Sequence, residues 1–152
     1  MDGYEAIAKI LKQEGVDWMA CFPSNPLIEA VAKEGIRPIM FRQERGGIMA
    51  ADGYSRTMNN SKFGVFACQG GPGAENSYGA IAQAWADSVP ILFLPDGVPL
   101  QTADVKPSFW ASRAYKDITK WAESINDSQR IVPLMRRAFH ALKNGRPGPV
   151  LL

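Results

Sequence analysis

The chain is organised around the segment Arg42-Gln43-Glu44-Arg45-Gly46-Gly47-Ile48-Met49-Ala50-Ala51-Asp52-Gly53-Tyr54-Ser55-Arg56. It follows a short apolar run, Pro38–Phe41, and this order predicts a buried strand that passes directly into a helix. In open α/β sheets, ligands bind at the carboxyl ends of the strands, so Glu44 stands where a ligand would be met. A glutamate in the first turn of a helix also stabilises the positive end of the helix dipole. Taken alone, Glu44 is compatible with both interpretations.

Small residues recur at helical spacing behind Glu44, and they form a smooth stripe of Gly46, Ala50, Gly53 and Thr57. A glycine inside a helix costs roughly 0.5–1 kcal/mol relative to alanine, so it needs a contact that offsets this cost. We therefore expect something to pack closely against the stripe.

Composition describes an ordinary soluble globular domain of 152 residues with a net charge of +2. Its 17 basic and 15 acidic residues are mixed along the chain, so no polybasic stripe predicts nucleic-acid or membrane binding. The N-terminus lacks a signal-peptide pattern, and no apolar run approaches the roughly 18 residues of a membrane span. These features predict a cytoplasmic protein. With one histidine and two cysteines there is no zinc ligand set, and we expect Cys21 and Cys68 to be buried free thiols.

Strand-like runs alternate with helical patterns along the chain. Strands are expected at residues 17–22, 38–41, 63–68, 89–94, 118–125 and 149–152, and helices after Asp2, Pro26, Gln43, the turn at 69–76, and Gln129. Such βαβ units imply parallel strands joined by right-handed crossovers. The sequence therefore predicts a single α/β domain over residues 1–152, with three layers and a mostly parallel central sheet of about six strands flanked by helices.

Two further segments stand out as candidate functional regions. Gln69–Asn76 is a glycine-rich strand-to-helix turn, whose backbone can approach a ligand closely, although it fits neither the dinucleotide nor the Walker spacing. Asn76 could also simply cap the helix that follows. Residues 98–116 show no period and carry Phe109, Trp110 and Tyr115, which look exposed; an irregular segment of this length is usually functional or covered by a partner.

Three blocks of sequence together resemble a known family. They are Arg42-Gln43-Glu44 with Ala51–Arg56; Gly71–Asn76 continued by Ala82, Ala84-Trp85 and Asp87–Pro90; and Ile118–Trp121 with Gly145–Val150. Over nearly its whole length the chain resembles the amino-terminal pyrimidine-binding domain of thiamine-diphosphate enzymes of the acetolactate synthase, pyruvate oxidase and benzoylformate decarboxylase group. The resemblance implies the thiamine-diphosphate-binding fold.

The resemblance also implies a chemistry and a set of site residues. In the family, the glutamate that matches Glu44 hydrogen-bonds the cofactor's aminopyrimidine and activates the thiazolium C2 for attack on a 2-keto acid. The resemblance implies that the cofactor is bound by Pro23, Ser24, Gly71, Pro72 and Asn76. It also implies that the substrate side is lined by Asn25, Gln43 and Gly70. The implied function is that of a 2-keto-acid lyase, decarboxylase or carboligase domain, the last being a transferase.

Several positions depart from the family pattern. Gln43 stands where many relatives have histidine, and Glu75 stands where they often have threonine. Gly70-Gly71 replaces a Thr/Ser-Ser start, and Asp96-Gly97 replaces a common Gly-Gln. A neutral amide at Gln43 can hydrogen-bond a substrate but cannot shuttle a proton at neutral pH. For these reasons the sequence does not assign acetolactate synthesis as the reaction.

The resemblance covers only half of a thiamine-diphosphate site. The family binds the diphosphate through Mg2+ in a separate domain, and this chain has no matching Gly-Asp-Gly and Asn motif. We expect the isolated chain to be inactive, and we expect a diphosphate-binding domain to be supplied in cis or in trans. We also expect a homo-oligomer, such as a dimer. The end of the sequence within a strand favours the first domain of a longer enzyme over one subunit of a two-chain sulfopyruvate- or phosphonopyruvate-type decarboxylase. A non-catalytic α/β assembly or regulatory module is the alternative from another class.

Overall fold

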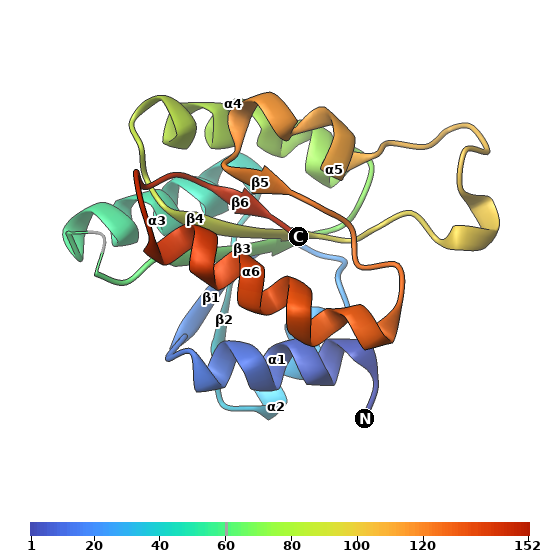
Figure 1. The fold of residues 1–152 in the computed structure, drawn as a ribbon, viewed down its shortest axis with the longest axis horizontal. Coiled ribbons are helices and arrows are strands. Elements are labelled where there is room, and N and C mark those ends of the chain that lie inside the picture. Colours follow the sequence, from blue (N-terminus) through green and yellow to red (C-terminus); the bar gives the residue numbers. More distant parts are fainter. Residues whose placement is uncertain (60) are drawn as a thin grey trace.

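The computed structural model describes residues 1–59 and 61–152 and shows a central sheet between two layers of helices (Figure 1). Within these residues six strands, all parallel, lie in the order β2-β1-β3-β4-β6-β5. They are β1 (Trp18–Cys21), β2 (Arg37–Met40), β3 (Gly64–Cys68), β4 (Ile91–Pro95), β5 (Trp121–Ala122) and β6 (Val150–Leu151). This architecture confirms the predicted α/β class with its parallel sheet.

The helices cover the two faces of the sheet. They are α1 (Gly3–Gln13), α2 (Leu27–Lys33), α3 (Glu44–Thr57), α4 (Pro72–Ala86), α5 (Ala111–Ala114) and α6 (Ile131–Lys143), with short 3₁₀ turns η1 (Leu100–Thr102), η2 (Lys116–Ile118) and η3 (Ser128–Arg130). One apolar core contains residues of α1, α2 and α6, and the other contains residues of α3 and α4 (Figure 1). None of the helices in the described part of the chain is long and apolar enough to cross a membrane.

The predicted helix ends follow the local chemistry of the sequence. Asp2 caps α1, and its carboxylate accepts from the Glu5 backbone N–H while the Glu5 side chain accepts from the Asp2 N–H. Pro133 lies in the first turn of α6, where its missing N–H costs no hydrogen bond. At the other end of α6 the Lys120 ammonium donates to the carbonyls of Ala141 and Asn144, which are left free by the helix C-terminus.

Two of the predicted strands differ from the structure. We expected residues 38–41 to form a buried strand, but β2 is an edge strand paired with β1, and Met40 is 52% exposed. The reason is Pro38, which has no N–H for a second ladder and is therefore confined to a sheet edge. The strand expected at 118–125 shortens to β5, because β5 is the opposite edge strand and the residues before it turn in η2.

Helix α3 packs on the sheet with a different face from the predicted one. A Cβ atom on Gly47 would lie 2.5 Å from the Phe66 ring, and a Cβ on Gly64 would lie 2.3 Å from the Ala51 carbonyl oxygen. The buried face of α3 thus runs through Gly47, Ile48, Ala51 and Ser55. The stripe of Gly46, Ala50, Gly53 and Thr57 stays partly or fully exposed, so the expectation of a close contact on it is not met within the described residues.

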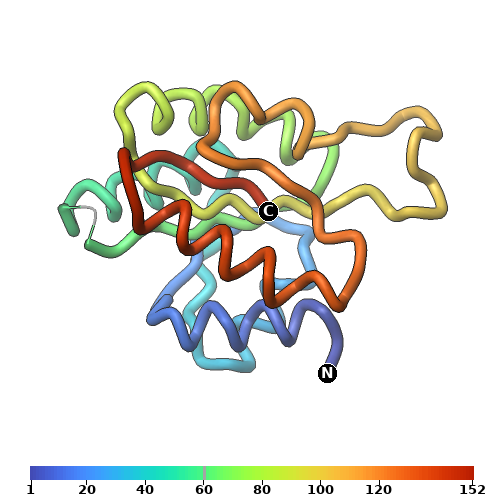
Figure 2. Tube along the Cα trace, viewed as in Figure 1, coloured from blue at the N-terminus to red at the C-terminus, as the bar shows by residue number. Residues whose placement is uncertain are grey.

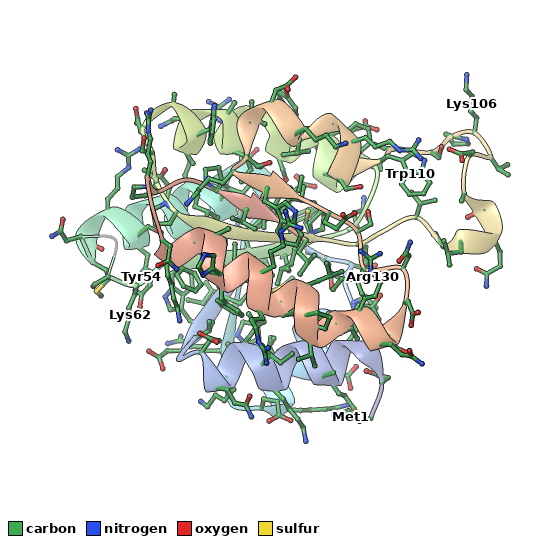
Figure 3. The ribbon with its side chains drawn as sticks, in the orientation of Figure 1. Met1, Tyr54, Lys62, Lys106, Trp110 and Arg130 are labelled. Atoms are coloured by element: carbon green, nitrogen blue, oxygen red, sulfur yellow. The ribbon has the colours of Figure 1, made fainter. Side chains whose placement is uncertain are left out.

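The segment from 98 to 116 is mostly irregular, as predicted, and projects from the body of the domain (Figure 2). Lys106 lies at its outer end and Trp110 lies closer to the body (Figure 3). The expectation that its aromatic residues are exposed is wrong for Tyr115, which is fully buried, whereas Phe109 and Trp110 are half-buried. The burial of Tyr115 depends on long-range contacts with Phe93 and Tyr78, which no local pattern encodes.

Two glycine substitutions on α3 test this packing. Gly47→Ala should lower the free energy of unfolding by about 1–3 kcal/mol, because its methyl group collides with the buried Phe66 ring. Gly53→Ala is the matched control: a Cβ there meets no atom within 4 Å, so the variant should gain roughly 0.5–1 kcal/mol of helix propensity. Urea unfolding of both variants checks the prediction, and equal stabilities would contradict the packing described here.

Candidate functional site

The candidate site lies at the carboxyl ends of β1, β2 and β3, which are neighbours in the sheet. Pro23–Asn25 follows β1, Gln43 and Glu44 follow β2, and Gly70–Asn76 follows β3. Residues far apart in sequence thus reach one edge of the sheet because parallel strands carry all their carboxyl ends to the same side. All the predicted site residues therefore lie on the loops or helix starts at this edge.

Glu44 is the first residue of α3 and is only 4% exposed. The Asn76 side-chain amide donates to its Oε2 at 3.5 Å, and a Cβ atom on Gly73 would lie 3.4 Å from its Oε1. The first turns of α4 thus contribute to the burial of Glu44, whereas Met40 of the preceding apolar run is exposed. Within residues 1–59 and 61–152, Asn76 is the side chain that hydrogen-bonds this carboxylate.

The first turn of α4 begins earlier than the sequence suggested. Gly71 precedes the helix with a positive φ of 58°, and Pro72 occupies the first helical position, where its fixed φ suits the helix. Asn76 is therefore the fifth residue of α4, so its predicted alternative role as a helix cap is wrong. Glu75 lies in the first turn of α4 and is exposed.

Asn25 is buried and ties the strand ends together. Its amide nitrogen donates to the carbonyls of Cys68 at 2.8 Å and Leu94 at 3.2 Å, and its Oδ1 accepts from the Leu27 N–H at 2.9 Å. Three of the hydrogen bonds that its side-chain amide can form are thus made to backbone groups. Asn25 fixes the ends of β3 and β4 relative to the start of α2.

The other predicted residues form the accessible part of the edge. Pro23 and Ser24 are exposed, and Gln43 is exposed at the N-cap position of α3, where its carbonyl accepts from the Gly47 N–H at 3.3 Å. Gly70 packs against the end of β4, because a Cβ atom there would lie 2.6 Å from the Asp96 carbonyl oxygen. The backbone of this turn is therefore close to β4 on one side and open on the other, since a Cβ on Gly71 would meet nothing within 4 Å.

Both cysteines are buried free thiols, as predicted. Burial raises the pKa of the Cys68 thiol to about 12, and the nearby carboxylates of Glu44 and Asp96 add to the increase. Burial likewise raises the pKa of Cys21 to about 11. Because the thiolate is the reactive form, neither cysteine is a nucleophile at neutral pH. The Cys68 sulfur instead fills the space under Gly73, close to the Ser77 hydroxyl at 3.8 Å.

A cavity of about 670 Å³ opens beside this group of residues, toward β4 and β6, and Glu44 lies outside its lining. Asn25 lines it together with Leu94, Asp96 and Trp110. The Tyr4 hydroxyl donates to Asp96 Oδ1 at 3.2 Å, and burial raises the pKa of the Asp96 carboxyl, although this hydrogen bond lowers it. The buried Glu44 carboxylate and this cavity are thus two separate features of the domain.

Sequence reasoning missed two contacts, that of Gly73 with Glu44 in the candidate site and that of Tyr4 with Asp96 in the neighbouring cavity. Gly73 lies within the glycine-rich turn, but only the packing of α4 against α3 shows that its missing side chain leaves room for the Glu44 carboxylate. Tyr4 reaches Asp96 from 92 residues away in sequence. A pairing of this kind has no local sequence pattern.

Comparison with known proteins identifies relatives of this arrangement. Residues 1–127 match the family described as "Thiamine pyrophosphate enzyme, N-terminal TPP binding domain". The chain is 35% identical to a probable acetolactate synthase large subunit of Methanocaldococcus jannaschii, over 99% of this chain and 26% of that protein. It is 32% identical to the acetolactate synthase large subunit of Lactococcus lactis, over 97% of this chain and 26% of that protein. It is also 33% identical to a chloroplastic acetolactate synthase of Nicotiana tabacum, over 99% of this chain and 23% of that protein. The chain thus spans about a quarter of the length of these relatives.

The ionisation of Asp96 predicts a pH dependence of stability. A carboxyl whose pKa is raised on folding stabilises the fold fully below its unfolded value of 3.8, and this contribution is lost as the pH rises through the folded value. Asp96→Asn cannot ionise, so its free energy of unfolding should improve relative to the wild type between about pH 3 and pH 7. Tyr4→Phe removes the hydrogen bond that opposes the shift and should steepen the loss. Urea unfolding across this range checks both, and parallel pH profiles for the three proteins would contradict the assignment.

Proposed function

The chain belongs to the N-terminal TPP-binding domain family of thiamine pyrophosphate enzymes, and from this premise we propose that it binds the aminopyrimidine half of thiamine diphosphate. Glu44 is the activating carboxylate in this proposal, and the Gly70–Asn76 turn and Pro23–Ser24 form the rest of the pyrimidine pocket. The reaction served is a lyase, decarboxylase or carboligase reaction of a 2-keto acid. Gln43, Asn25 and Gly70 face the substrate side.

The burial of Glu44 is the observation that carries the proposal. A carboxylate that only balanced a helix dipole would be free to point into water, because such charges act at exposed helix ends. Glu44 is instead 4% exposed, and it lies under a turn that has glycine at the closest point of contact. Burying a charge without partners is costly, so its retention at a strand end supports a role in binding.

The residues at the strand ends fit the aminopyrimidine. The Asn76 amide occupies Glu44 Oε2, which leaves Oε1 to accept or donate a proton toward a ring nitrogen. The open side of Gly71 and the exposed Pro23 and Ser24 leave backbone groups accessible for a flat, polar ring. When bound, the cofactor supplies the electron sink for breaking the bond next to the keto carbon. The chain's own contribution is to orient the ring and to hold the proton at Glu44.

The proposed site is completed by a second domain. The relatives are about four times as long as this chain. The family resemblance implies that the Mg2+ and diphosphate contacts belong to a separate domain. We therefore propose that a diphosphate-binding domain, in the same chain or in a partner, covers the edge of the sheet beside Glu44. The exposed stripe of Gly46, Ala50 and Gly53 is suited to such close contact, because it has no long side chains.

Replacing Glu44 tests the assignment in the assembled enzyme. Glu44→Gln keeps the size of the side chain and one hydrogen-bonding oxygen but cannot exchange a proton. Exchange of the cofactor C2 proton and turnover should both fall by roughly 10²–10⁴-fold, with the fold intact. The enzyme is incubated in deuterated buffer, exchange is stopped at set times, and the remaining C2 proton is measured by NMR.

Glu75→Gln is the matched control for that experiment, since it makes the same change at the start of the neighbouring helix. Glu75 is exposed in the first turn of α4, so its loss should cost about 0.3–1 kcal/mol of stability and little activity. Wild-type C2 exchange in Glu44→Gln, or its loss in Glu75→Gln, would refute the role given to Glu44.

The 152-residue chain alone should bind thiamine diphosphate weakly and turn over no substrate. The diphosphate carries most of the ligand's charge, and the family binds it through Mg2+. This chain lacks the sequence motif with which the family holds that Mg2+. Isothermal titration calorimetry with and without Mg2+ measures this directly. Adding a diphosphate-binding domain should restore tight binding; tight, Mg2+-dependent binding by the chain alone would overturn the proposal.

The chain should also self-associate through the surfaces that a second domain would cover, the Gly46–Ala50–Gly53 stripe and the Phe109–Trp110 segment. Sedimentation velocity should show association that rises with concentration. Ala50→Arg should weaken it, whereas Ala32→Arg, the same change on the exposed side of α2, should not. A strictly monomeric wild-type chain at high concentration would count against this interface.

A further inference from the structure

Tyr115 is a fully buried residue to which the proposed function gives no role. Its ring packs against Phe93, with centroids 5.4 Å apart, and edge-on against Tyr78 at 5.1 Å. Its hydroxyl donates to the Ala74 carbonyl at 2.5 Å. A buried tyrosine hydroxyl normally finds a partner, so the bond by itself needs no functional explanation. The position of the acceptor, the Ala74 carbonyl, does need an explanation.

Ala74 is the third residue of α4, in the turn that covers Glu44. Gly73, directly before it, is the residue whose missing Cβ makes room for Glu44 Oε1, and Asn76, two residues after it, donates to Glu44 Oε2. The Tyr115 hydroxyl therefore holds a backbone carbonyl that lies between the two residues in contact with the Glu44 carboxylate.

The first turn of α4 has no side-chain cap, and besides its burial it is held by the Ser77 hydroxyl, which donates to the Gly73 carbonyl at 2.7 Å. Gly71 provides no side-chain cap, and the first backbone bond of the helix is the one from the Glu75 N–H to the Gly71 carbonyl at 2.9 Å. Helix ends without capping side chains fray readily. The hydrogen bond from Tyr115 to the Ala74 carbonyl caps none of the free N–H groups, but it ties this turn to a buried side chain outside the helix.

Tyr115 is itself fixed from the other side. The buried Thr119 hydroxyl donates to the Tyr115 carbonyl at 2.7 Å, and the Lys120 N–H donates to the Pro149 carbonyl at 2.8 Å, next to β6. Burial also raises the pKa of the Tyr115 hydroxyl above its ordinary value, so it remains a donor at any physiological pH. A continuous series of bonds thus runs from the β6 side of the sheet to the first turn of α4.

We propose that Tyr115 is a positioning residue, which holds the first turn of α4 against α3 and so sets the geometry between Glu44 and Asn76. The relevance of this geometry to catalysis rests on the proposed function, whereas the effect of the bond on the turn does not. The end of the irregular 98–116 segment thereby acquires a definite role, as the support of the Glu44 site from behind.

Two tyrosine-to-phenylalanine variants of the chain test this inference by amide hydrogen exchange and NMR. Tyr115→Phe removes only the hydroxyl, and the amides of Glu75, Asn76 and Ser77 should exchange roughly 2–12-fold faster, the worth of one net hydrogen bond. The side-chain amide signals of Asn76 should also shift. Tyr78→Phe, the same change on α4 against the same ring, should leave both readouts as in the wild type. Thr119→Val should reproduce the Tyr115→Phe pattern more weakly.

The outcomes separate the possible explanations. Uniformly faster exchange in α4 and in the β3 core would show that Tyr115 only adds global stability. Unchanged exchange at Glu75–Ser77 would show that the hydrogen bond does not hold the turn. Either result overturns the inference. In the assembled enzyme, Tyr115→Phe should raise the concentration of thiamine diphosphate for half-saturation by a similar factor. If the wild-type enzyme did not bind thiamine diphosphate, but the amide exchange rates changed as expected, the proposed function would be wrong. The positioning role of Tyr115 would still be supported.

Discussion

The contact between the Glu44 carboxylate and the first turns of α4 is the constraint on which the rest of this structure depends. A carboxylate that is 4% exposed needs compensation, because an ion taken out of water without partners destabilises the fold by several kcal/mol. The N-terminus of α3 and the Asn76 amide provide part of it. The other carboxylate oxygen, Oε1, lies against Gly73.

The rest of the domain can be understood as the support for that contact. The strand order brings β1, β2 and β3 together, so that three loops meet at one edge. Gly47 lets α3 lie directly on Phe66, which fixes the helix that carries Glu44. Asn25 locks the ends of β3 and β4, and Tyr115 holds α4 from the opposite side. The close approach of the Phe66 ring explains why glycine occurs at position 47.

Sequence reasoning predicted the features that are set by local chemistry. The alternation of strands and helices, the Asp2 cap and the place of Pro133 all follow from patterns within a few residues. It failed where long-range packing decides: the buried Tyr115, and Asn76, which lies inside α4 and faces Glu44. The edge position of β2 was predictable from Pro38, because proline cannot pair on both sides of a strand. Whether the predicted site residues act as proposed depends on a ligand and a second domain, which no pattern in this chain contains.

A structure of the assembled enzyme with thiamine diphosphate bound tests the central claim most directly. We expect a Glu44 carboxylate oxygen within hydrogen-bond distance of an aminopyrimidine ring nitrogen, about 2.7–3.2 Å, with Asn76 still on the other oxygen. The ring would lie at the ends of β1, β2 and β3, beside the Gly70–Asn76 turn. An aminopyrimidine bound in the cavity beside Tyr4 and Asp96, with Glu44 out of reach, would contradict it.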